Sequence, residues 1–394
     1  MRRGSLALLA SLFVAALALR PQLVGVGPLV PEIQGDLDVS HAVAGLLTTI
    51  PVLCMSLFAL PAALMSDRLG PRAAMTLCLV GIAGFGLARA AAPAAPTLLL
   101  LTFGMSMGLG AAQAVVPVAV KEDFPTRPAF ATGIYALGIN LGSAVSSAIS
   151  VPVADATGSW RWTLAAYSLF SVGLVAGWLA LTRHAPPHER SGARPPRLPW
   201  RSGLAWRLAG IFGLMAVTFY GLNAWLPDAY VERGWSEGTA GALLATLNIA
   251  ALVTTLTIPW LADRYGSRRV YLTTLSGLMA ASVVGLVLVP GAAWLWVLLA
   301  GLAIGGLFPI VLTLPLDAAE RPADVGAVAA MMLFGGYLIG ATAPLGLGAV
   351  RDASGSFTTT LWLIAAAATA MLALCASMSR ERLHAGAGRR RALS

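Results

Sequence analysis

The sequence DRLGPR at residues 67–72 returns, slightly altered, as DRYGSRR at residues 263–269. The two copies begin 196 residues apart, almost half of the 394-residue chain, and each lies between two long apolar runs. Pro117 likewise has a counterpart 192 residues later, at Pro309. A repeat of half the chain length is typical of transporters built from two similar helical halves, whose substrate site lies between the halves.

The composition is that of a membrane protein. Hydrophobic residues make up 58% of the chain and charged residues 11%, with a mean hydropathy of +0.79, whereas soluble domains have about 25% charged residues. We therefore predict an all-α integral membrane protein with twelve transmembrane helices in two pseudo-symmetric six-helix bundles. Runs long enough to cross a bilayer as helices lie at residues 5–31, 42–65, 73–90, 95–119, 129–153, 161–182, 205–230, 238–262, 268–289, 293–316, 324–350 and 357–378.

One long polar stretch, rich in Arg and Pro, separates the sixth apolar run from the seventh. We therefore divide the chain into an N-terminal bundle at 1–182, a cytoplasmic linker at 183–204, and a C-terminal bundle with a basic cytoplasmic tail at 205–394. The connections between the other runs are short, as expected for antiparallel neighbours in a helical bundle.

The basic residues are distributed unevenly between the two sides of the predicted bundle. Of the 26 Lys and Arg residues, 21 fall on the side of both termini, four fall on the other side, and Arg20 lies inside a run. By the positive-inside rule, we expect both termini in the cytoplasm and the chain in the cell (inner) membrane. This bias accounts for the net charge of +9 without nucleic acid, so the expected partner is the lipid bilayer. The four residues on the other side are Arg89, Arg161, Arg233 and Arg351.

Arg20 is the conspicuous residue of the first apolar run. At about 1.5 Å per helical residue, it lies roughly 25 Å from Arg3 and roughly 18 Å from Glu32, too far for its side chain to reach either interface. Placing a charge at this depth costs about 2.5–3.5 kcal/mol on insertion scales. Pro21 cannot donate to the carbonyl of Leu17, so the helix is expected to kink or loosen here. We interpret Arg20 as an anion-binding residue; the alternative is a structural arginine bonded to the freed carbonyls.

Apart from Arg20, we expect no ionisable side chain at membrane depth. The 17 Asp and Glu residues and the four His residues, at positions 41, 184, 188 and 384, can all be placed at run ends or in loops. Proton-driven carriers usually have a titratable group within the membrane. The sequence therefore predicts uniport, anion exchange, or co-transport in which the substrate itself carries the proton.

Several polar and aromatic residues inside the runs are candidates for the substrate site. Tyr220 and Asn223 share one face of the seventh run, the counterpart of the run that carries Arg20, so an anion could be held between the halves. Phe308, beside Pro309, could pack on a planar ligand. The alternative is that such polar residues only join helices, at about 0.6 kcal/mol each. The remaining candidates are Gln113, Asn140, Asn248 and Tyr337.

No motif for catalysis, metal binding or nucleotide hydrolysis is present in the sequence. The three cysteines lack metal-ligand spacing, and no Walker, H-E-x-x-H or G-x-S-x-G motif occurs. We therefore expect no cofactor, no use of ATP and no enzymatic activity. A membrane enzyme or a sensor would need a catalytic constellation or a sizeable cytoplasmic domain, and neither is visible.

The D-R-x-G-x-R loops resemble the loop motif of the major facilitator superfamily, although Ala63 and Pro259 stand where that motif usually has Gly. The segments at 17–40, 44–62 and 335–352 resemble its cyanate-permease and nitroimidazole-transporter branch. The resemblance implies alternating-access transport of small, often anionic solutes, a cavity lined mainly by the first, fourth, seventh and tenth helices, and a monomer. It leaves open the alternative of an exporter for neutral or acidic drug-like or nitro-aromatic compounds.

The same loops are candidate gating elements. Their aspartates lie at helix ends among arginines and could accept charge-assisted hydrogen bonds that latch the cytoplasmic face and release as the halves rock. The alternative is that the loops only set topology. The residues concerned are Asp67, Arg68 and Arg72 in the first loop, and Asp263, Arg264 and Arg268 in the second.

Overall fold

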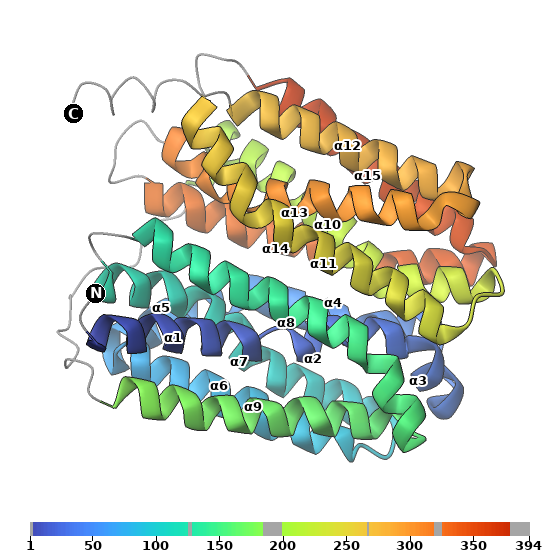
Figure 1. The fold of residues 1–394 in the computed structure, drawn as a ribbon, viewed down its shortest axis with the longest axis horizontal. Helices are drawn as coiled ribbons and strands as arrows, with labels where there is room; N and C mark the ends of the chain where they lie inside the picture. Colours follow the sequence, from blue (N-terminus) through green and yellow to red (C-terminus); the bar gives the residue numbers. More distant parts are fainter. Residues whose placement is uncertain (1–2, 125–127, 184–198, 266–267, 319–324, 379–394) are drawn as a thin grey trace.

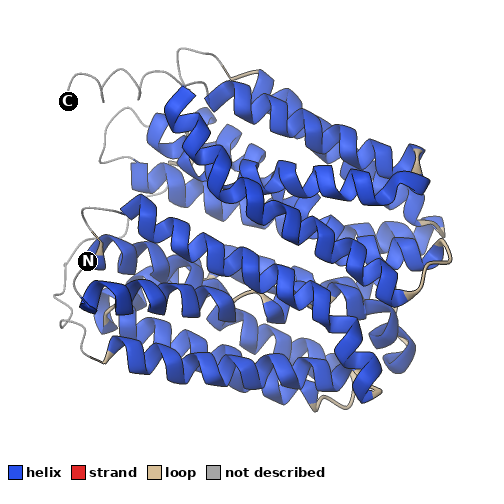
Figure 2. Ribbon diagram, in the orientation of Figure 1, coloured by secondary structure: helices blue, strands red, loops and turns tan. Residues whose placement is uncertain are grey.

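A computed structural model describes residues 3–124, 128–183, 199–265, 268–318 and 325–378. This part of the chain is almost entirely helical and contains no strand (Figure 2). Within it, eleven helices are long and apolar enough to cross a membrane, and a twelfth apolar helix, His41–Leu57, is shorter. The prediction of an all-α membrane protein is confirmed. Most of the predicted linker, at 184–198, lies outside the described residues.

The helices follow the order of the predicted runs (Figure 1). In the first half they are α1 (Arg3–Ala18), α2 (Pro21–Val24), η1 (Gly27–Leu29), α3 (Val30–Leu37), α4 (His41–Leu57), α5 (Ala59–Leu69), α6 (Pro71–Ala90), α7 (Ala95–Asp123), α8 (Pro128–Thr157) and α9 (Trp160–Thr182). In the second half they are α10 (Gly203–Glu232), α11 (Glu237–Tyr265), α12 (Arg268–Leu288), η2 (Pro290–Ala292), α13 (Ala293–Ala318), α14 (Val325–Ser354) and α15 (Phe357–Ala376).

The two halves of the chain lie side by side (Figure 1). Within the first half, α1 packs on α8 and α9, and α6 packs on α7. Within the second, α10 packs on α14 and α15, and α11 packs on α13. The halves meet mainly through two helix pairs, α4 with α14 and α8 with α11. We call the end of the bundle where α3 ends and α4 begins the far end, since it lies opposite the start of α1.

The first apolar run is broken into four short helices. The first piece, α1, ends at Ala18, and α2 begins at Pro21 with Arg20 as its N-cap residue. Pro28 then occupies the start of the 3-10 turn η1. Proline has no N–H for the helix hydrogen-bond ladder and its ring collides with the carbonyl four residues earlier. The loosening predicted at Pro21 is therefore present.

The second run, expected to be continuous over 42–65, also consists of two helices. The helix α4 ends at Leu57 and α5 begins at Ala59, with Phe58 between them at φ −90° and ψ −1°. Pro61 explains the position of this break, because its ring would collide with the carbonyl of Leu57 in a continuous helix. The prediction of one continuous helix over 42–65 is therefore wrong at Phe58.

The half-chain repeat reappears in the turns that open α9 and α15. Gly158 and Gly355, 197 residues apart, both have φ of +71°. In each copy the next residue is the serine N-cap, Ser159 or Ser356, whose side chain accepts a hydrogen bond from a backbone N–H of the first turn. A positive φ favours glycine because it has no Cβ. The same local device therefore starts the last helix of each half.

In each half, a glutamate of the first apolar run binds the same turn: Glu32 lies in α3 and Glu232 ends α10. The Glu32 Oε1 accepts from the backbone N–H of Trp160 at 2.9 Å, and Glu232 Oε1 accepts from that of Phe357 at 3.2 Å. Carboxylates at helix N-termini satisfy free N–H groups and complement the helix dipole. These paired contacts tie the first and last helices of each half together at the far end.

We predict opposite outcomes for two glycine substitutions, one in the turn before α9 and one inside that helix. Gly158→Ala should destabilise the protein by about 1–2 kcal/mol, because alanine is strained at positive φ. Gly173→Ala, inside α9 where a Cβ would meet nothing within 4 Å, should be neutral or stabilising. Melting temperatures of the purified variants in detergent provide the measurement; equal losses in both would contradict the capping role.

Candidate substrate-binding site

A small cavity lies at the break in the first helix and is lined by both halves of the chain. Its volume is about 50 Å³. Most of its wall is apolar or aromatic, and Arg20 is its one cationic lining residue. The lining consists of Arg20, Ile139, Asn140, Ser143, Phe212, Met215, Ala216, Phe219, Tyr220, Asn248, Ala251, Thr255, Ile304, Gly305, Phe308 and Tyr337.

Arg20 is buried in this cavity with most of its donors uncommitted. Its exposed fraction is 4%, and its Nη1 donates one long hydrogen bond, of 3.4 Å, to the Tyr220 hydroxyl. Its Nε has no hydrogen-bond partner. No aspartate or glutamate of the described residues forms an ion pair with it. A guanidinium has five N–H donors, so the cavity contains a cation with unused hydrogen-bonding capacity.

The break in the helix sets the position of Arg20. Its backbone carbonyl accepts from the N–H groups of Leu23 and Val24, at 3.0 and 2.9 Å, as the N-cap of α2. Gly142 on α8 permits a close approach, because a Cβ there would lie 3.1 Å from the Leu17 carbonyl and 3.4 Å from the Arg20 Cβ. The side chain therefore leaves the helix at a fixed point beside α8.

Other side chains satisfy the carbonyls that the break sets free. The Ser150 hydroxyl lies 2.7 Å from the Gly25 carbonyl oxygen, and Arg89 Nη2 donates to the Gln22 backbone carbonyl at 2.9 Å and to its Oε1 at 2.8 Å. Unsatisfied backbone groups are costly within a membrane. Irregular backbone persists here because neighbouring helices supply the donors.

The position of Arg89 differs from the expectation. The sequence places it at a membrane edge, and it does lie in the last turn of α6, yet its side chain is 0% exposed. The cause is the broken first helix, which presents a free carbonyl at this level, and so Arg89 turns inward to Gln22. Among the first-half residues whose burial is described, Arg20 and Arg89 are thus the two buried arginines, but Arg89 does not line the cavity.

Aromatic side chains of the second half form much of the cavity wall. The rings of Phe212 and Tyr337 meet edge to face with centroids 4.9 Å apart, and Phe308 lies 6.4 Å from Phe212. Phe219 packs against the ring of Tyr220 at 5.2 Å. These rings provide flat apolar surfaces on which a planar solute can stack.

The asparagines of the site also connect helices. Asn140 Nδ2 donates to Thr255 Oγ1 at 2.8 Å, joining α8 of one half to α11 of the other. Asn248 Nδ2 donates to Asn223 Oδ1 at 3.2 Å, joining α11 to α10. Asn140 and Asn248 line the cavity, whereas Asn223 is buried behind them and donates to the Phe219 carbonyl.

Six of the eight residues proposed from the sequence therefore meet at one cavity. Gln113 is among the two that do not: its Oε1 accepts from the Tyr135 hydroxyl at 3.0 Å, away from the lining. Phe212, Met215 and Phe219 also line the cavity and are not among the residues predicted from the sequence. Their spacing of three to four residues, on the face of α10 that carries Tyr220, is a helical periodicity that could have found them.

The loops proposed as gates can be followed only in part. The side chains of Asp67, Asp263 and Arg264 lie outside the described part of the structure. Arg68 is exposed in the last turn of α5, Arg72 lies in the first turn of α6, and Arg268 begins α12. The latch between these loops stays a prediction.

Long apolar helices in two repeated halves, around a cavity to which both halves contribute, define a polytopic membrane transporter. The family model of the Major Facilitator Superfamily matches residues 6–344, and the chain belongs to this family. It is a multi-pass membrane protein and a transporter, not an enzyme.

Its relatives and a solved structure agree with this assignment. The chain is 31% identical to the cyanate transport protein CynX of Escherichia coli (strain K12), covering 88% of this chain and 90% of CynX. It is 29% identical to the 2-nitroimidazole transporter of the same organism, covering 96% and 97%. The crystal structure of a D-xylose-proton symporter superposes with a TM-score of 0.73 at 16% identity, covering 96% and 98%, and shares the fold.

We predict that removing a serine hydroxyl of α8 that bonds to the broken first helix lowers stability more than removing one that bonds only within α8. Ser150→Ala should lower stability by about 1–3 kcal/mol, because the Gly25 carbonyl loses its donor. Ser147→Ala is the control, since that hydroxyl bonds only to carbonyls of its own helix and such bonds add little. Thermal unfolding of the two variants is compared; a loss of equal size in Ser147→Ala would remove the argument.

Proposed function

We propose that this protein transports a small anion across the membrane by alternating access, with Arg20 as the central anion-binding residue. The observation that carries the proposal is the buried guanidinium, which faces a cavity shared by both halves and has no carboxylate partner among the described residues. A relative named for cyanate transport supports an anionic substrate.

Charge balance favours a monovalent substrate. An isolated charge is costly in a low-dielectric interior, and one bound monoanion neutralises one guanidinium. Arginine can also donate two parallel hydrogen bonds to a flat anion, which lysine cannot. The small volume of the cavity favours a solute of few atoms.

We assign supporting roles to the other proposed residues. Tyr220 shares the anion with Arg20 through its hydroxyl, and Phe308 and Tyr337 pack on the substrate. Asn140 and Asn248 offer amide groups from opposite halves, so the substrate contacts both. Asn223 holds Asn248.

The second candidate is efflux of neutral or acidic nitro-aromatic or drug-like compounds. The aromatic wall formed by Phe212, Phe219 and Phe308 favours it, as does the relative named as a 2-nitroimidazole transporter. An uncharged nitro group accepts hydrogen bonds from a guanidinium but gives no charge balance. The two functions therefore differ in how strongly binding depends on the charge of Arg20.

We further propose how the molecule is arranged when it moves. Units 1–182 and 205–394 rock against each other, joined by the linker at 183–204. Both termini face the cytoplasm, the membrane is the cell (inner) membrane, and the monomer is the working unit. The D-R-x-G-x-R loops latch the cytoplasmic face when it closes.

Substitution of Arg20 tests the binding role. Cyanate and nitrate should raise the melting temperature of the purified wild type, because binding to the folded state stabilises it. We expect Arg20→Lys to weaken binding roughly ten- to hundredfold, the size of one charge-assisted contact, and Arg20→Ala to abolish it. Arg161→Lys, at an exposed ion pair with Asp36, is the control.

Binding that survives Arg20→Ala unchanged would show that the anion site is elsewhere. Binding of neutral 2-nitroimidazole but of no anion by the wild type would favour the second candidate. The comparison needs no transport assay, so it is independent of the orientation of the protein in a vesicle.

The gating role of Asp67 is tested in proteoliposomes. Asp67→Asn should slow substrate uptake several-fold and leave the apparent affinity nearly unchanged, because a latch acts on the conformational step and not on the bound substrate. Asp36→Asn, at the far end, should leave this behaviour as in the wild type. A large loss of affinity with normal turnover in Asp67→Asn would contradict the latch.

A further inference from the structure

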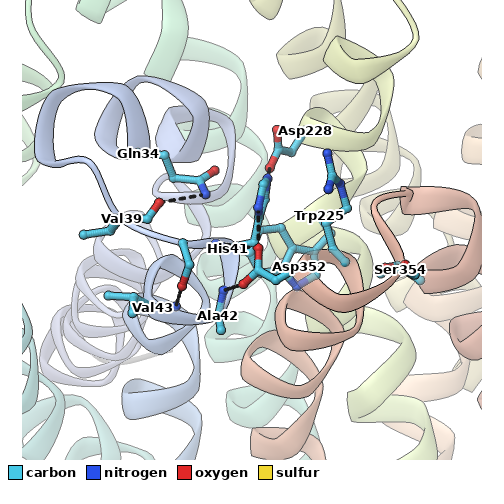
Figure 3. A network of polar contacts seen from close by, with 12 residues as sticks. Gln34, Val39, His41, Ala42, Val43, Trp225, Asp228, Asp352 and Ser354 are labelled. Carbon is cyan, nitrogen blue, oxygen red and sulfur yellow. Dashed lines mark hydrogen bonds and ion pairs between the residues drawn. The ribbon is translucent and has the colours of Figure 1, made fainter.

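A cluster of ionisable side chains joins the two halves at the far end (Figure 3). His41, the first residue of α4, comes from the first half, and Asp228 on α10 and Asp352 on α14 come from the second. His41 Nδ1 lies 2.8 Å from Asp352 Oδ1, and His41 Nε2 lies 3.4 Å from Asp228 Oδ2. Both ring nitrogens of one imidazole thus face carboxylates.

The sequence analysis places His41 and the carboxylates at run ends or in loops, and the structure differs from this at Asp228. Asp228 is one turn inside α10 and only 7% exposed. The rings of Trp225 and Phe357 lie 5.9 and 5.4 Å from the imidazole. Asp228 is therefore largely withdrawn from water, and its charge must be satisfied within the protein, whereas the side chains of His41 and Asp352 are 22% and 30% exposed.

Asp352 also caps a helix of the other half. Its Oδ1 accepts from the backbone N–H of His41 at 3.2 Å, and its Oδ2 accepts from that of Ala42 at 2.9 Å. A carboxylate at a helix N-terminus is favourable. The halves touch closely here, because a Cβ on Gly348 would lie 2.6 Å from the His41 carbonyl oxygen. Separating the halves at the far end must break all of these contacts.

The geometry requires a proton that a neutral histidine and two ionised carboxylates do not provide. Neutral imidazole donates from one nitrogen only, and imidazolium donates from both. If Nδ1 carries the hydrogen toward Asp352, the lone pair of Nε2 faces Asp228 Oδ2, which has no hydrogen-bond donor in the structure. One additional proton, on either His41 or Asp228, converts this repulsion into a hydrogen bond.

The other charged groups around the cluster pair with other residues or act on Asp228 only through space. Arg351 on α14 pairs with Glu232 on α10 at 2.7 Å, and these two, with Glu237 on α11, act on Asp228 through space. On α3, Glu32 and Asp36 bind the start of α9. None of these groups donates a hydrogen bond to Asp228 Oδ2.

We propose that closing the far end binds one proton in the His41–Asp228–Asp352 cluster, so that the pH on that side controls how readily the halves separate there. When the halves part, His41 is exposed to water and returns the proton to the same side. The site therefore senses protons without moving them across the membrane. It rests on the alternating-access part of the proposed function and not on the substrate.

The sign follows from proton linkage. The closed state holds one more proton than the open state, so it is favoured as pH falls and lost as pH rises. For a single coupled proton, the ratio of closed to open molecules changes by at most tenfold per pH unit. Imidazole titrates ordinarily in the physiological range, so pH 6 to 9 is the range to examine.

The experiment measures the distance between the halves at the far end by double electron–electron resonance in substrate-free protein. Spin labels are attached at Ala94→Cys and Gly291→Cys, which are exposed in the turns before α7 and α13; the three native cysteines are buried. We expect the short-distance population to decrease from pH 6 to pH 9 in the wild type.

Two variants and one control complete the test. Asp228→Asn lets a neutral amide donate to Nε2 and should stay closed at every pH, and His41→Gln, which does not titrate, should also lose the pH dependence. Asp36→Asn, at a far-end ion pair within the first half, should keep the wild-type response. A wild type insensitive to pH, or variants at both positions that respond as the wild type does, would falsify the proposal. Loss of anion binding at Arg20 would not affect this measurement.

Discussion

The structure depends on one constraint, a guanidinium held inside a membrane bundle where the first helix is broken. Pro21 ends the regular ladder, Arg20 caps the short helix that follows, and Arg89 and Ser150 bind the carbonyls set free. The protein thus supplies donors to the broken backbone, and no acid in the described part of the chain pairs with Arg20. Since a lone buried charge is unfavourable, the cation is satisfied best by something that enters the cavity.

The interface between the halves is open around the cavity and closely packed at the far-end cluster. Around Arg20 the halves leave space, bridged by contacts such as Asn140 with Thr255. At the far end α4 and α14 meet closely, with Asp352 capping a helix of the other half. Ionisable contacts across a two-state interface are well suited to switching, because removing one proton changes several bonds together. We therefore expect the substrate to act at the cavity and the proton at the far end, both on the same movement of the halves.

The sequence predicted the fold because its signals are local. Apolar runs, a half-chain repeat and a charge beside Pro21 can be read without knowing which helices touch. Arg20, Tyr220 and Tyr337 are found for the same reason, being polar where the neighbours are apolar. The contact between His41 and Asp228 was missed because each lies near a helix end, and only the packing of the helices brings the two side chains together and buries Asp228. Arg89 was misplaced because the free carbonyl of Gln22 exists only in the folded chain.

The central claim is that Arg20 binds the transported anion directly. The most direct measurement is a crystal structure of the protein with selenocyanate, whose selenium can be located by its anomalous scattering. We expect one bound anion in the cavity, with an acceptor atom about 2.7–3.2 Å from the guanidinium nitrogens of Arg20. A guanidinium that is instead paired with a protein carboxylate, with the selenium bound at another place, would contradict it.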